Sequence, residues 1–589
     1  MFIFLLMLFV SSCTFIEEKY TGKAIVEPTE GPSLRDAEAL ILLEPNSSKG
    51  NEVADLIRQN NGKVKYITKE AIIATNVPLT KLFKNGDVKN IFFNGNMYPL
   101  EEPYKKETRL LAQNWVYQEE KPDKDTNGEG PIPHIESDLR VKSEIQGGLF
   151  KSTASSFCDR PGTGTAVNTG FCDTTEFMAG DVSVAIILME SNGMIDNETE
   201  DWNSTEEAEV TSEILNALSW WVERAEENNI PLTFHPTFYY KVPTGYEPIN
   251  HNSVNGDTCD YMGDEYLWKN DALGYLGVTE DCWEGEITFL NNLREQDNTD
   301  WAFAIFVVDS SNDPDGRFLD NKFAYSWLGG PSFTMTYDNY AVTIENMEVV
   351  AAHETGHIFW AFDQYAQSHG CHVAGDCEKT TGYLNVENQN CVMGGCTSNE
   401  PSIMRGGTSP YFSKQIDTYA KGQIGWLDNS EQGKPYILLT QPTTYINEYS
   451  PNPTSQTELG LTGFAQETQG HPNSNPYHMT WPSVYGPLND ISINSISVVE
   501  YRLNNGPWIE ISCSDGSCDS REESYQFTTV PAIISLSGAK NLFEIKSKNN
   551  VGFESEIVSE EITVKKQGKR TLISELSLPN IPSFRLPWQ

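Results

Sequence analysis

The segment His353–His357, which reads HETGH, constrains this chain more than any other stretch. On a helix, two histidines at this spacing lie one turn above each other, so both imidazoles can reach one metal ion. Glu354 lies beside them, where its carboxylate can take a proton from water that zinc acidifies. Thr343 to Phe362 is rich in apolar residues, which predicts a buried helix. The pattern therefore predicts a zinc site with its own base, and thus hydrolysis.

A catalytic zinc ion takes three protein ligands and keeps a fourth position for water, so one further ligand is needed. Asp363 follows His357 closely enough for a chain that leaves the helix to return a carboxylate to the metal. Asp363 is therefore a candidate for the third ligand beside His353 and His357.

The composition narrows the class of protein. The chain has 589 residues, enough for several domains, and 38% of them are hydrophobic. Its formal net charge of −42 argues against general binding to nucleic acid, because phosphate contacts depend on clustered Lys and Arg. We expect a monomer whose partners are protein or peptide substrates.

The N-terminus predicts export. Phe2 to Val10 is apolar but too short to span a bilayer as a stable helix. It is followed by Ser-Ser-Cys, and the run that ends at Cys13 resembles the lipobox of prokaryotic lipoproteins, in which the Cys is lipidated. We expect residues 1–13 to form a signal peptide with a lipid anchor on Cys13, which would attach an exported protein to the membrane. The alternatives are a plain secretory signal and an uncleaved anchor.

The cysteines support the same prediction. There are 11, and without Cys13 they form an even set of close sequence neighbours. Such a set is typical of disulfides in an oxidising compartment, although sequence alone does not fix the connectivity. The neighbours are Cys158 with Cys172, Cys259 with Cys282, Cys371 with Cys377, Cys391 with Cys396, and Cys513 with Cys518.

Residues 25–100 contain the pattern of a small α/β domain. Strands are expected at Ala39–Glu44 and Val88–Phe93 and a strand pair at Lys63–Thr75, with helices at Asn51–Gln59 and Leu79–Lys84. This order resembles the ferredoxin-like propeptides of some secreted proteases, and an unrelated adaptor domain is the alternative. Residues 101–135 are charged and aperiodic, which predicts an exposed linker where proteolytic activation could occur.

Residues 136–432 are expected to form the zinc domain. The predicted order is a buried strand at Val182–Met189, a long helix opened by a capping box at Ser204–Glu207, a strand at Leu232–Val242, helices near 264–276 and 285–296, a buried strand at Trp301–Val308, and an edge strand or hairpin at Phe323–Tyr337. The acidic loop Asp309–Gly316 could hold calcium, and a plain acidic turn is the alternative.

This order of elements, with a zinc helix and a later methionine turn, resembles the metzincin metalloproteases over roughly residues 180 to 428. The helix is similar to HExxHxxGxxD, the form with an aspartate ligand found in immune inhibitor A and snapalysin types. The resemblance implies a mixed twisted sheet, zinc bound by His353, His357 and Asp363, and Glu354 as general base. One position departs from the pattern, because the family glycine is Trp360 here, and Trp tolerates a positive φ poorly.

Alternatives exist for the third zinc ligand and for the methionine turn. Glu378 competes with Asp363, because its spacing after His357 is near that of thermolysin-like enzymes, although its neighbours favour no helix. Ser402-Ile403-Met404 is similar to the methionine turn of several metzincins, and Cys391-Val392-Met393 resembles that of others. We expect Met404, because it leads through Tyr411 into a closing helix at Ser413–Gly422. Tyr365 and Tyr411 are candidates for oxyanion stabilisation.

A second metal site is conceivable just after the zinc helix. Its ligands would come from His369, Cys371, His372, Cys377, Cys391 and Cys396. In an exported chain, disulfides that brace a loop over the cleft are the preferred interpretation.

Residues 435–565 change to short strands and turns. Ile496–Leu503, the Asn505-Gly506 turn and Trp508–Ile511 predict a hairpin, and further strands are expected at Tyr525–Val530 and Leu542–Ser547. The pattern resembles a fibronectin type III or Ig-like β-sandwich. Residues 566–589 are expected to be a tail.

Together these features predict a multidomain, exported zinc endopeptidase that hydrolyses peptide bonds with a zinc-bound water and Glu354 as general base. The alternative is a cell-surface binding or adhesion protein whose metzincin-like domain is a scaffold without catalysis.

Overall fold

The fold is described by a computed structural model. It divides into two compact units, one of residues 1–441 and 467–494, the other of residues 442–466 and 495–589. The structure describes residues 38–45, 47–82, 84–93, 104–105, 108–109, 111–112, 138–140, 157–197, 199–253, 264–338, 343–429, 432–456, 458–529 and 539–565.

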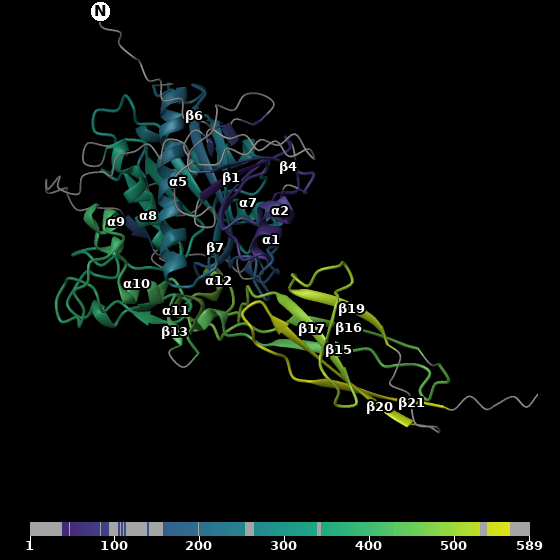
Figure 1. The fold of residues 1–589 in the computed structure, drawn as a ribbon. Helices are drawn as coiled ribbons and strands as arrows, with labels where there is room; N and C mark the ends of the chain where they lie inside the picture. The colour runs from purple at the N-terminus through teal and green to yellow at the C-terminus, as the bar shows by residue number, and fades with distance from the viewer. Residues whose placement is uncertain are drawn as a thin grey trace, which may run out of the picture. The chain divides into compact units, whose positions relative to one another are not determined.

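The first unit is organised around one large mixed sheet (Figure 1). Its strands are β1 (Glu38–Leu43), β2 (Lys63–Ile67), β3 (Ala71–Thr75), β4 (Val88–Phe93), β5 (Asp138–Arg140), β6 (Gly180–Ser191), β7 (Leu232–Thr244), β8 (Trp301–Val308), β9 (Ala324–Trp327) and β10 (Ser332–Thr336). They lie in the order β4-β1-β3-β2-β7-β6-β8-β10-β9-β5. The strands expected from the sequence at the centre of this sheet are confirmed.

The sheet centre is fully buried because helices cover both faces. Strand β6 pairs in parallel with β7 and β8, and β8 is buried at every residue. Such continuous apolar strands are typical of sheets covered on both sides. Helices α6 (Glu265–Tyr275) and α7 (Cys282–Asp297) share a core cluster with alternate residues of β6 and β8.

The opposite face of the sheet carries α5 (Ser204–Glu227) and α8 (Met347–Ile358), which lie side by side in Figure 1. The Trp221 Nε1 of α5 donates a hydrogen bond to the Ala352 carbonyl of α8 at 2.9 Å. The capping box of α5 is present but begins one residue earlier than expected, at Asn203, whose side chain accepts from the Thr205 and Glu206 amides. An asparagine is as good a cap as a serine there.

The N-terminal α/β segment continues this sheet. All its expected elements form, with helices α1 (Gly50–Arg58) and α2 (Leu79–Leu82) between the strands. Strand β2 pairs in parallel with β7 through Tyr66 and Phe234, and the Tyr66 hydroxyl donates to the Leu215 carbonyl at 2.8 Å. Residues 38–93 therefore share a sheet with the zinc helix domain, and their role as a propeptide stays a prediction.

The start of the expected linker is not exposed. Tyr104, Thr108 and Leu111 are buried. The Thr108 hydroxyl and the Lys105 amide both donate to the buried Glu70 carboxylate, at 2.9 and 2.8 Å. The prediction of an exposed linker is wrong for these residues, and the activation cleavage stays a prediction.

The first unit also contains smaller elements, most of which follow α8. They are the 3-10 helices at Pro248–Asn250, Ile344–Asn346, Asp376–Glu378, Ile403–Arg405 and Tyr436–Leu438, the helices α9 (Ser409–Phe412), α10 (Thr418–Gln423), α11 (Pro476–Thr480) and α12 (Pro482–Tyr485), and the strands β11 (Thr380–Thr381), β12 (Val386–Glu387), β13 (Asp428–Asn429) and β14 (Lys434–Pro435). The expected closing helix at 413–422 is shorter, because Lys414 has a positive φ of 57° and the helix restarts with Asp417 as its N-cap.

The predicted C-terminal domain is interrupted. Residues 467–494, which carry α11 and α12, belong to the first unit and not to the β domain expected over 435–565. Their Val484 and Tyr485 share an apolar cluster with Leu328, Trp360 and Phe362. This segment therefore packs beside the end of the zinc helix, although the sequence places it between two strands of the other unit.

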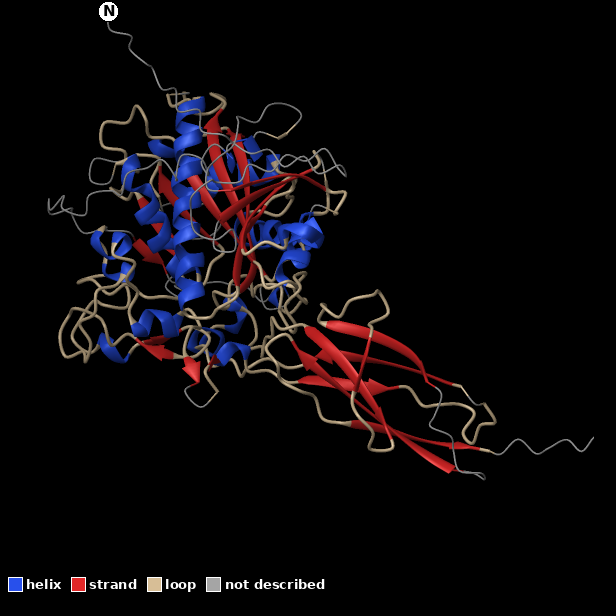
Figure 2. Cartoon of the chain, viewed as in Figure 1, coloured by secondary structure: helices blue, strands red, loops and turns tan. Residues whose placement is uncertain are grey.

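The second unit consists of strands (Figure 2). Its two sheets have the orders β15-β16-β19 and β18-β17-β20-β21. The strands are β15 (Pro442–Ile446), β16 (Leu459–Glu467), β17 (Ile496–Leu503), β18 (Ile509–Ile511), β19 (Glu522–Thr529), β20 (Ala539–Asn549) and β21 (Val558–Val564). Ala465, Tyr525, Val499 and Ile545, from both sheets, share one core cluster, as in a sandwich.

The hairpin between β17 and β18 is confirmed, with a small change in its turn. Asn504 and Asn505 both have positive φ, 51° and 59°, and the Gly506 amide donates to the Leu503 carbonyl at 2.9 Å. A two-residue turn with two left-handed residues matches the twist of a hairpin. The turn therefore lies one residue earlier than the Asn-Gly pair suggested.

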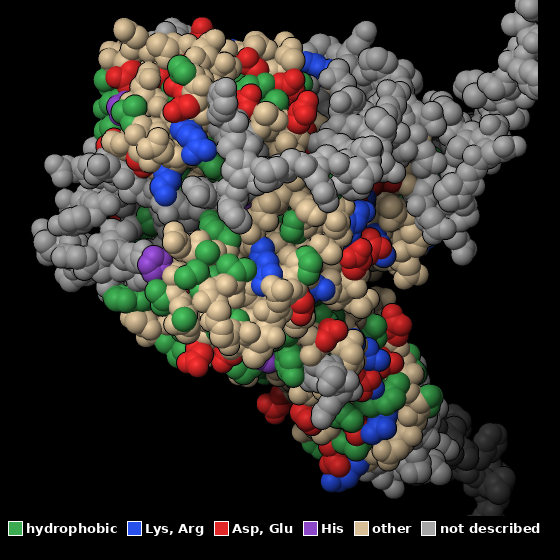
Figure 3. Space-filling model, turned by 90° about the vertical axis from the view of Figure 1, so that its left-hand side faces the viewer, with side chains coloured by type: hydrophobic (Ala, Val, Ile, Leu, Met, Phe, Trp, Pro, Cys, Tyr) green, Lys and Arg blue, Asp and Glu red, His purple; other side chains and the backbone are tan. Residues whose placement is uncertain are grey.

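Charged side chains are mixed on the face shown in Figure 3. Among the residues drawn there in colour, Lys and Arg are scattered between Asp and Glu and form no broad basic patch. None of the helices in the described part of the chain has both the length and the apolar character that crossing a bilayer requires.

Candidate metal centre

Helix α8 carries both histidines and Glu354 on a fully buried segment. All twelve of its residues are buried, as the apolar stretch around HETGH predicted. Gly356 lets another chain segment approach, because a Cβ there would lie 2.7 Å from the Met404 sulfur. Helix α8 is thus packed on all sides, which fixes the positions of its imidazoles.

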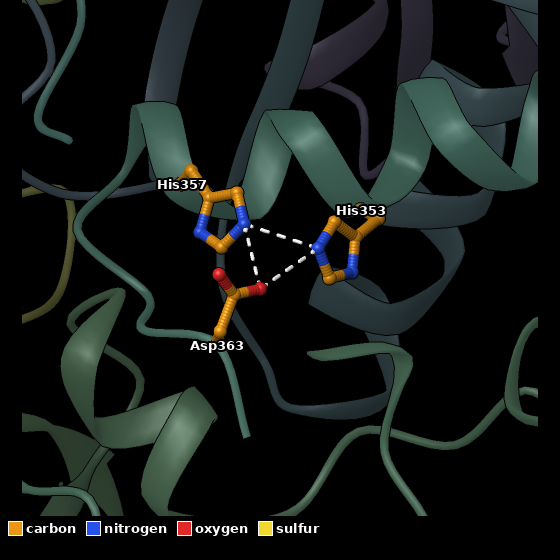
Figure 4. Close-up of side chains that lie close together, drawn as sticks. All are labelled: His353, His357 and Asp363. Carbon is orange, nitrogen blue, oxygen red and sulfur yellow. Dashed lines mark hydrogen bonds and ion pairs between the residues drawn. The ribbon is translucent and has the colours of Figure 1, made fainter. Parts of the chain in front are cut away.

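The structure brings His353, His357 and Asp363 together (Figure 4). The two Nε2 atoms are 3.0 Å apart, and Asp363 Oδ1 lies 3.1 Å from that of His353 and 3.2 Å from that of His357. All three side chains have no solvent exposure. Two imidazoles and a carboxylate therefore converge on one buried point.

Backbone carbonyls fix the orientation of both rings. His353 Nδ1 lies 2.9 Å from the Ile403 carbonyl, and His357 Nδ1 lies 2.7 Å from the Ala361 carbonyl. A carbonyl can only accept, so each Nδ1 carries the hydrogen and each Nε2 is left to face Asp363. This is the usual arrangement around metal-binding histidines.

The charges of the cluster shift its pKa values. Burial alone would lower the pKa of His353, but the hydrogen bond and charge of Asp363, with the charge of Glu354, raise it above its usual range. Burial would raise the pKa of Asp363, but the two histidines outweigh this effect and lower it. Asp363 is therefore an ionised carboxylate, the form that binds cations.

Trp360 adopts the backbone conformation that a glycine would favour. Its φ is 77°, in the left-handed region. Its amide and that of Gly329 both donate to the His357 carbonyl at 3.0 Å, and the Ala361 amide donates to the Gly356 carbonyl. The chain thus turns off the helix as the glycine-containing pattern does, and Asp363 reaches the histidines despite the tryptophan.

Surrounding aromatic residues hold Trp360 in this conformation. Its ring centroid lies 5.6 Å from those of Tyr477 and His478 and 5.3 Å from that of Tyr485. Only a glycine fits at 329, because a Cβ there would lie 2.4 Å from the Trp360 ring. A positive φ in a bulky residue is unfavourable, so packing of this kind is needed to maintain it.

Asp363, and not Glu378, is the carboxylate at the histidines. Glu378 is exposed in the 3-10 helix Asp376–Glu378. The Asp363 carbonyl accepts a hydrogen bond from Asn388 Nδ2 at 2.9 Å, and the same nitrogen donates to the Gly370 carbonyl at 2.8 Å. Asn388 therefore fixes the backbone that presents the carboxylate.

The other candidate residues are also resolved by position. Met404 is buried against Gly356, in the turn whose Ile403 carbonyl faces His353, whereas Met393 is half-buried. The Tyr365 ring centroid lies 6.2 Å from that of His353. Tyr411 instead stacks on Trp220, with centroids 5.6 Å apart. Of the two tyrosines, Tyr365 is the one close to the candidate metal ligands.

The disulfides differ from the neighbour pairing in one region. Cys158–Cys172 and Cys513–Cys518 form as the sequence spacing suggested. Near the zinc helix the pairs are Cys371–Cys391 and Cys377–Cys396, so the pairs 371–377 and 391–396 are wrong. The reason is the hairpin of β11 and β12, which places residues before Thr380 alongside residues after Glu387. These four cysteines are therefore not available as zinc thiolates.

Several sequence predictions are left open. Cys282 is disulfide-bonded, and its expected partner Cys259 lies outside the described residues, as does Cys13 with its signal segment. In the acidic loop, Asp309 and Asp313 accept hydrogen bonds from the loop's own amides. The loop is not among the metal-ligand groups found in the described residues, so its calcium stays a prediction.

A second buried group that could hold a metal ion was not predicted from the sequence. It consists of Asp173, Glu176 and His478. Its histidine comes from the interrupting segment 467–494 and its carboxylates from the residues before β6. The only local signal was an acidic pair next to Cys172, and nothing in the sequence linked it to one of the nine histidines.

Comparisons with known proteins leave the family open. No protein-family profile and no curated protein matches the chain. Solved structures that match include the fibronectin(III)-like modules of CbhA from Clostridium thermocellum, with 16% identity over 22% of this chain and 48% of that chain and a TM-score of 0.12. The FN1–FN3 domains of chicken CNTN1 match with 12% identity over 21% of this chain and 33% of that one, with a TM-score of 0.12.

Astrotactin-2, described as a vertebrate-specific, perforin-like membrane protein, matches with 16% identity over 28% of this chain and 31% of its own, with a TM-score of 0.16. The matches thus span less than half of each of these chains. TM-scores this low define neither the fold nor the function of this chain.

Proposed function

We propose that this protein is a zinc-dependent endopeptidase, in which His353, His357 and Asp363 hold the metal and Glu354 is the general base. The observation that carries the proposal is the convergence of two imidazole Nε2 atoms and one carboxylate oxygen within 3.2 Å of one another, with Glu354 next in sequence to the first histidine.

The donor set suits zinc. With both Nδ1 hydrogens directed to carbonyls, the Nε2 lone pairs and the Asp363 carboxylate face one another, an arrangement that a cation stabilises. Asp363 Oδ2 is buried without a hydrogen-bond partner in the described part of the chain. Two histidines and a carboxylate form a three-ligand set of the kind that catalytic zinc ions use, and one position is left for water or substrate.

Zinc, when bound, supplies a Lewis acid that activates water and polarises a peptide carbonyl. The chain's own contribution is the Glu354 carboxylate, which takes a proton from the attacking water and passes it to the leaving amine. Tyr365, near His353, is a candidate donor to the oxygen that becomes negative. The Ile403 carbonyl orients the His353 ring, and Met404 packs at Gly356 of the same helix.

The remaining parts of the chain fit the same proposal. The disulfides favour an oxidising compartment, which supports export and a lipid anchor on Cys13. A metzincin-like origin would account for the zinc helix, the aspartate ligand and the methionine turn. The sandwich of the second unit, with its fibronectin III-like pattern, would serve in adhesion, spacing or substrate presentation.

The test compares the full chain with its Glu354→Gln variant on a denatured protein substrate, with bound zinc measured in both. Loss of the general base should lower kcat by about 10²–10⁴-fold while zinc is retained. Glu345→Gln is the matched control, because this exposed glutamate precedes the same helix and loses the same charge. Its activity should equal that of the wild type.

Undiminished cleavage by Glu354→Gln would exclude the mechanism. Wild-type protein that binds zinc but cleaves no substrate would favour the binding or adhesion protein with a metzincin-like scaffold.

A further inference from the structure

A second cluster of metal-binding side chains lies in the first unit, apart from the HETGH helix. His478 Nε2 lies 3.0 Å from Glu176 Oε2 and 3.1 Å from Glu176 Oε1. One ligand atom from each of Asp173, Glu176 and His478 lies within 4.8 Å of the others, and all three residues are buried. An imidazole and two carboxylates therefore meet in the interior.

The orientation of His478 leaves its Nε2 facing carboxylate oxygens. Its Nδ1 lies 3.2 Å from the Gly486 carbonyl, which can only accept, so this nitrogen carries a hydrogen. A lone pair on Nε2 would repel the Glu176 oxygens. A cation must lie between them, either a proton on Nε2 or a metal ion.

A proton on His478 would still leave one carboxylate oxygen of the cluster without a partner. Asp173 Oδ2 accepts from the Gly170 amide at 2.7 Å and from Asn489 Nδ2 at 2.8 Å. Among the residues that the structure describes, Asp173 Oδ1 has no hydrogen-bond partner, although Asp173 has no solvent exposure. The buried Arg294 donates to the Asp173 backbone carbonyl and to the Thr169 hydroxyl, and not to the carboxylate. An unpartnered carboxylate oxygen in the interior is costly.

We propose that Asp173, Glu176 and His478 bind a divalent transition-metal ion, of the class of Zn²⁺ or Mn²⁺. The imidazole favours these ions over Ca²⁺ and Mg²⁺, which prefer oxygen ligands throughout. Two carboxylates neutralise the double charge of the ion, so its burial leaves no net charge. The ion also gives Asp173 Oδ1 the partner that it lacks.

The position of this site gives it a structural role. The ion joins the residues that precede β6 to α11 of segment 467–494, which lie 302 residues apart. The His478 ring is one of those packed against Trp360, at 5.6 Å. The metal therefore fastens the segment that supports the turn after the zinc helix. This inference goes beyond the proposed peptidase activity and does not depend on it.

The test uses the full chain with His353→Ala, so that bound metal reports on the second cluster alone. The protein is incubated with Zn²⁺ or, separately, Mn²⁺, freed of excess ion by gel filtration, and analysed by mass spectrometry of the metal. We expect about one ion per chain. Asp173→Asn, which has nearly the same shape, and His478→Ala should each weaken binding at least tenfold when added to this background.

Asp173→Asn in the wild-type background should lower the zinc content by about one ion per chain, without loss of an ion bound by His353, His357 and Asp363. The proposal is overturned if the folded His353→Ala chain retains neither ion. It is also overturned if the retained ion is unaffected by both Asp173→Asn and His478→Ala, and the cluster is then a proton-linked ion pair. Failure of the peptidase proposal would show instead in the Glu354→Gln comparison.

Discussion

Two buried clusters in the first unit orient their histidines in the same way but differ in the number of carboxylates. In each, an imidazole Nε2 lies close to a carboxylate oxygen, at 3.1 Å for His353 with Asp363 and 3.0 Å for His478 with Glu176. In each, the Nδ1 faces a backbone carbonyl. The first cluster has two imidazoles and one carboxylate, whereas the second has one imidazole and two carboxylates.

Under the two proposals, this difference would separate a catalytic from a structural role. A divalent ion with two neutral imidazoles and one carboxylate would keep a net charge of 2 − 1 = +1, which helps it to acidify water. With two carboxylates the net charge would be 2 − 2 = 0, so the ion would be a weaker Lewis acid and easily buried. The first cluster also has Glu354, the residue after His353 on α8, as its proposed base.

The largest expected effect concerns the third ligand of the first cluster. Asp363→Ala should remove the zinc of this cluster and abolish cleavage, because it leaves two ligands for a metal that requires three. Glu378→Ala should leave both quantities unchanged, since Glu378 is exposed. Zinc content and peptidase rate, measured on both variants, test this comparison. If Glu378→Ala lost zinc and Asp363→Ala kept it, Glu378 would be the third ligand in place of Asp363.

The second prediction concerns pH in the chelated protein. Burial would lower the pKa of His478, but the charge and hydrogen bond of Glu176, with the charge of Asp173, raise it to about 9. A raised pKa gives stability that is complete below the unfolded value of 6.5 and is lost as pH rises through about 9. The loss should be of the order of 3 kcal/mol in the free energy of unfolding.

Urea unfolding of wild type and His478→Gln at several pH values measures this effect, with EDTA present. The stability difference between the two proteins should shrink as pH rises from 6.5 to 9. With Zn²⁺ in place of EDTA it should persist, because the metal replaces the proton. A difference that grows with pH in EDTA would contradict the charge balance assigned to the cluster.

Each cluster has a supporting asparagine, and these form a matched pair. Asn388 donates to the Asp363 carbonyl at 2.9 Å, and Asn489 donates to the Asp173 carboxylate at 2.8 Å. Loss of such an outer partner typically weakens metal binding about 10–100-fold. Asn388→Ala should therefore weaken only the first site, and Asn489→Ala only the second. Competition with a zinc-binding dye measures the zinc affinity of both sites in each variant. A variant that weakened both sites equally would show that the sites are not independent.

The smallest effect tests how Trp360 is accommodated. Both Trp360→Ala and Trp360→Gly lose the aromatic packing, which should cost about 3–5 kcal/mol. Only glycine adopts the φ of 77° without strain, so the glycine variant should be the more stable of the two by about 1 kcal/mol. Denaturant unfolding in parallel measures the difference. An alanine variant as stable as the glycine variant would show that the turn relaxes when the ring is removed.

The N-terminal elements and the HETGH helix could be predicted because their signals are local. The short apolar runs in β1 to β4 and the apolar run of α8 involve residues a few positions apart, and Asp363 is only six residues from His357. The crossed disulfides could not be predicted, because Cys371 and Cys391 are brought together by a hairpin between strands of two residues each. Such short strands leave no periodic signal.

The sequence by itself determined that His353 and His357 share one helix, one turn apart, and it left Asp363 and Glu378 as alternatives for the third member. The structure brings Asp363 to the histidines. Only the tertiary structure decided that Trp360 takes a positive φ, since the energy for that conformation comes from Tyr477, His478 and Tyr485, more than a hundred residues away. The tertiary structure alone also decided which residues form the second cluster. Its carboxylates and its histidine have no spacing that a local pattern can encode, and packing of segment 467–494 against the first unit brings them together.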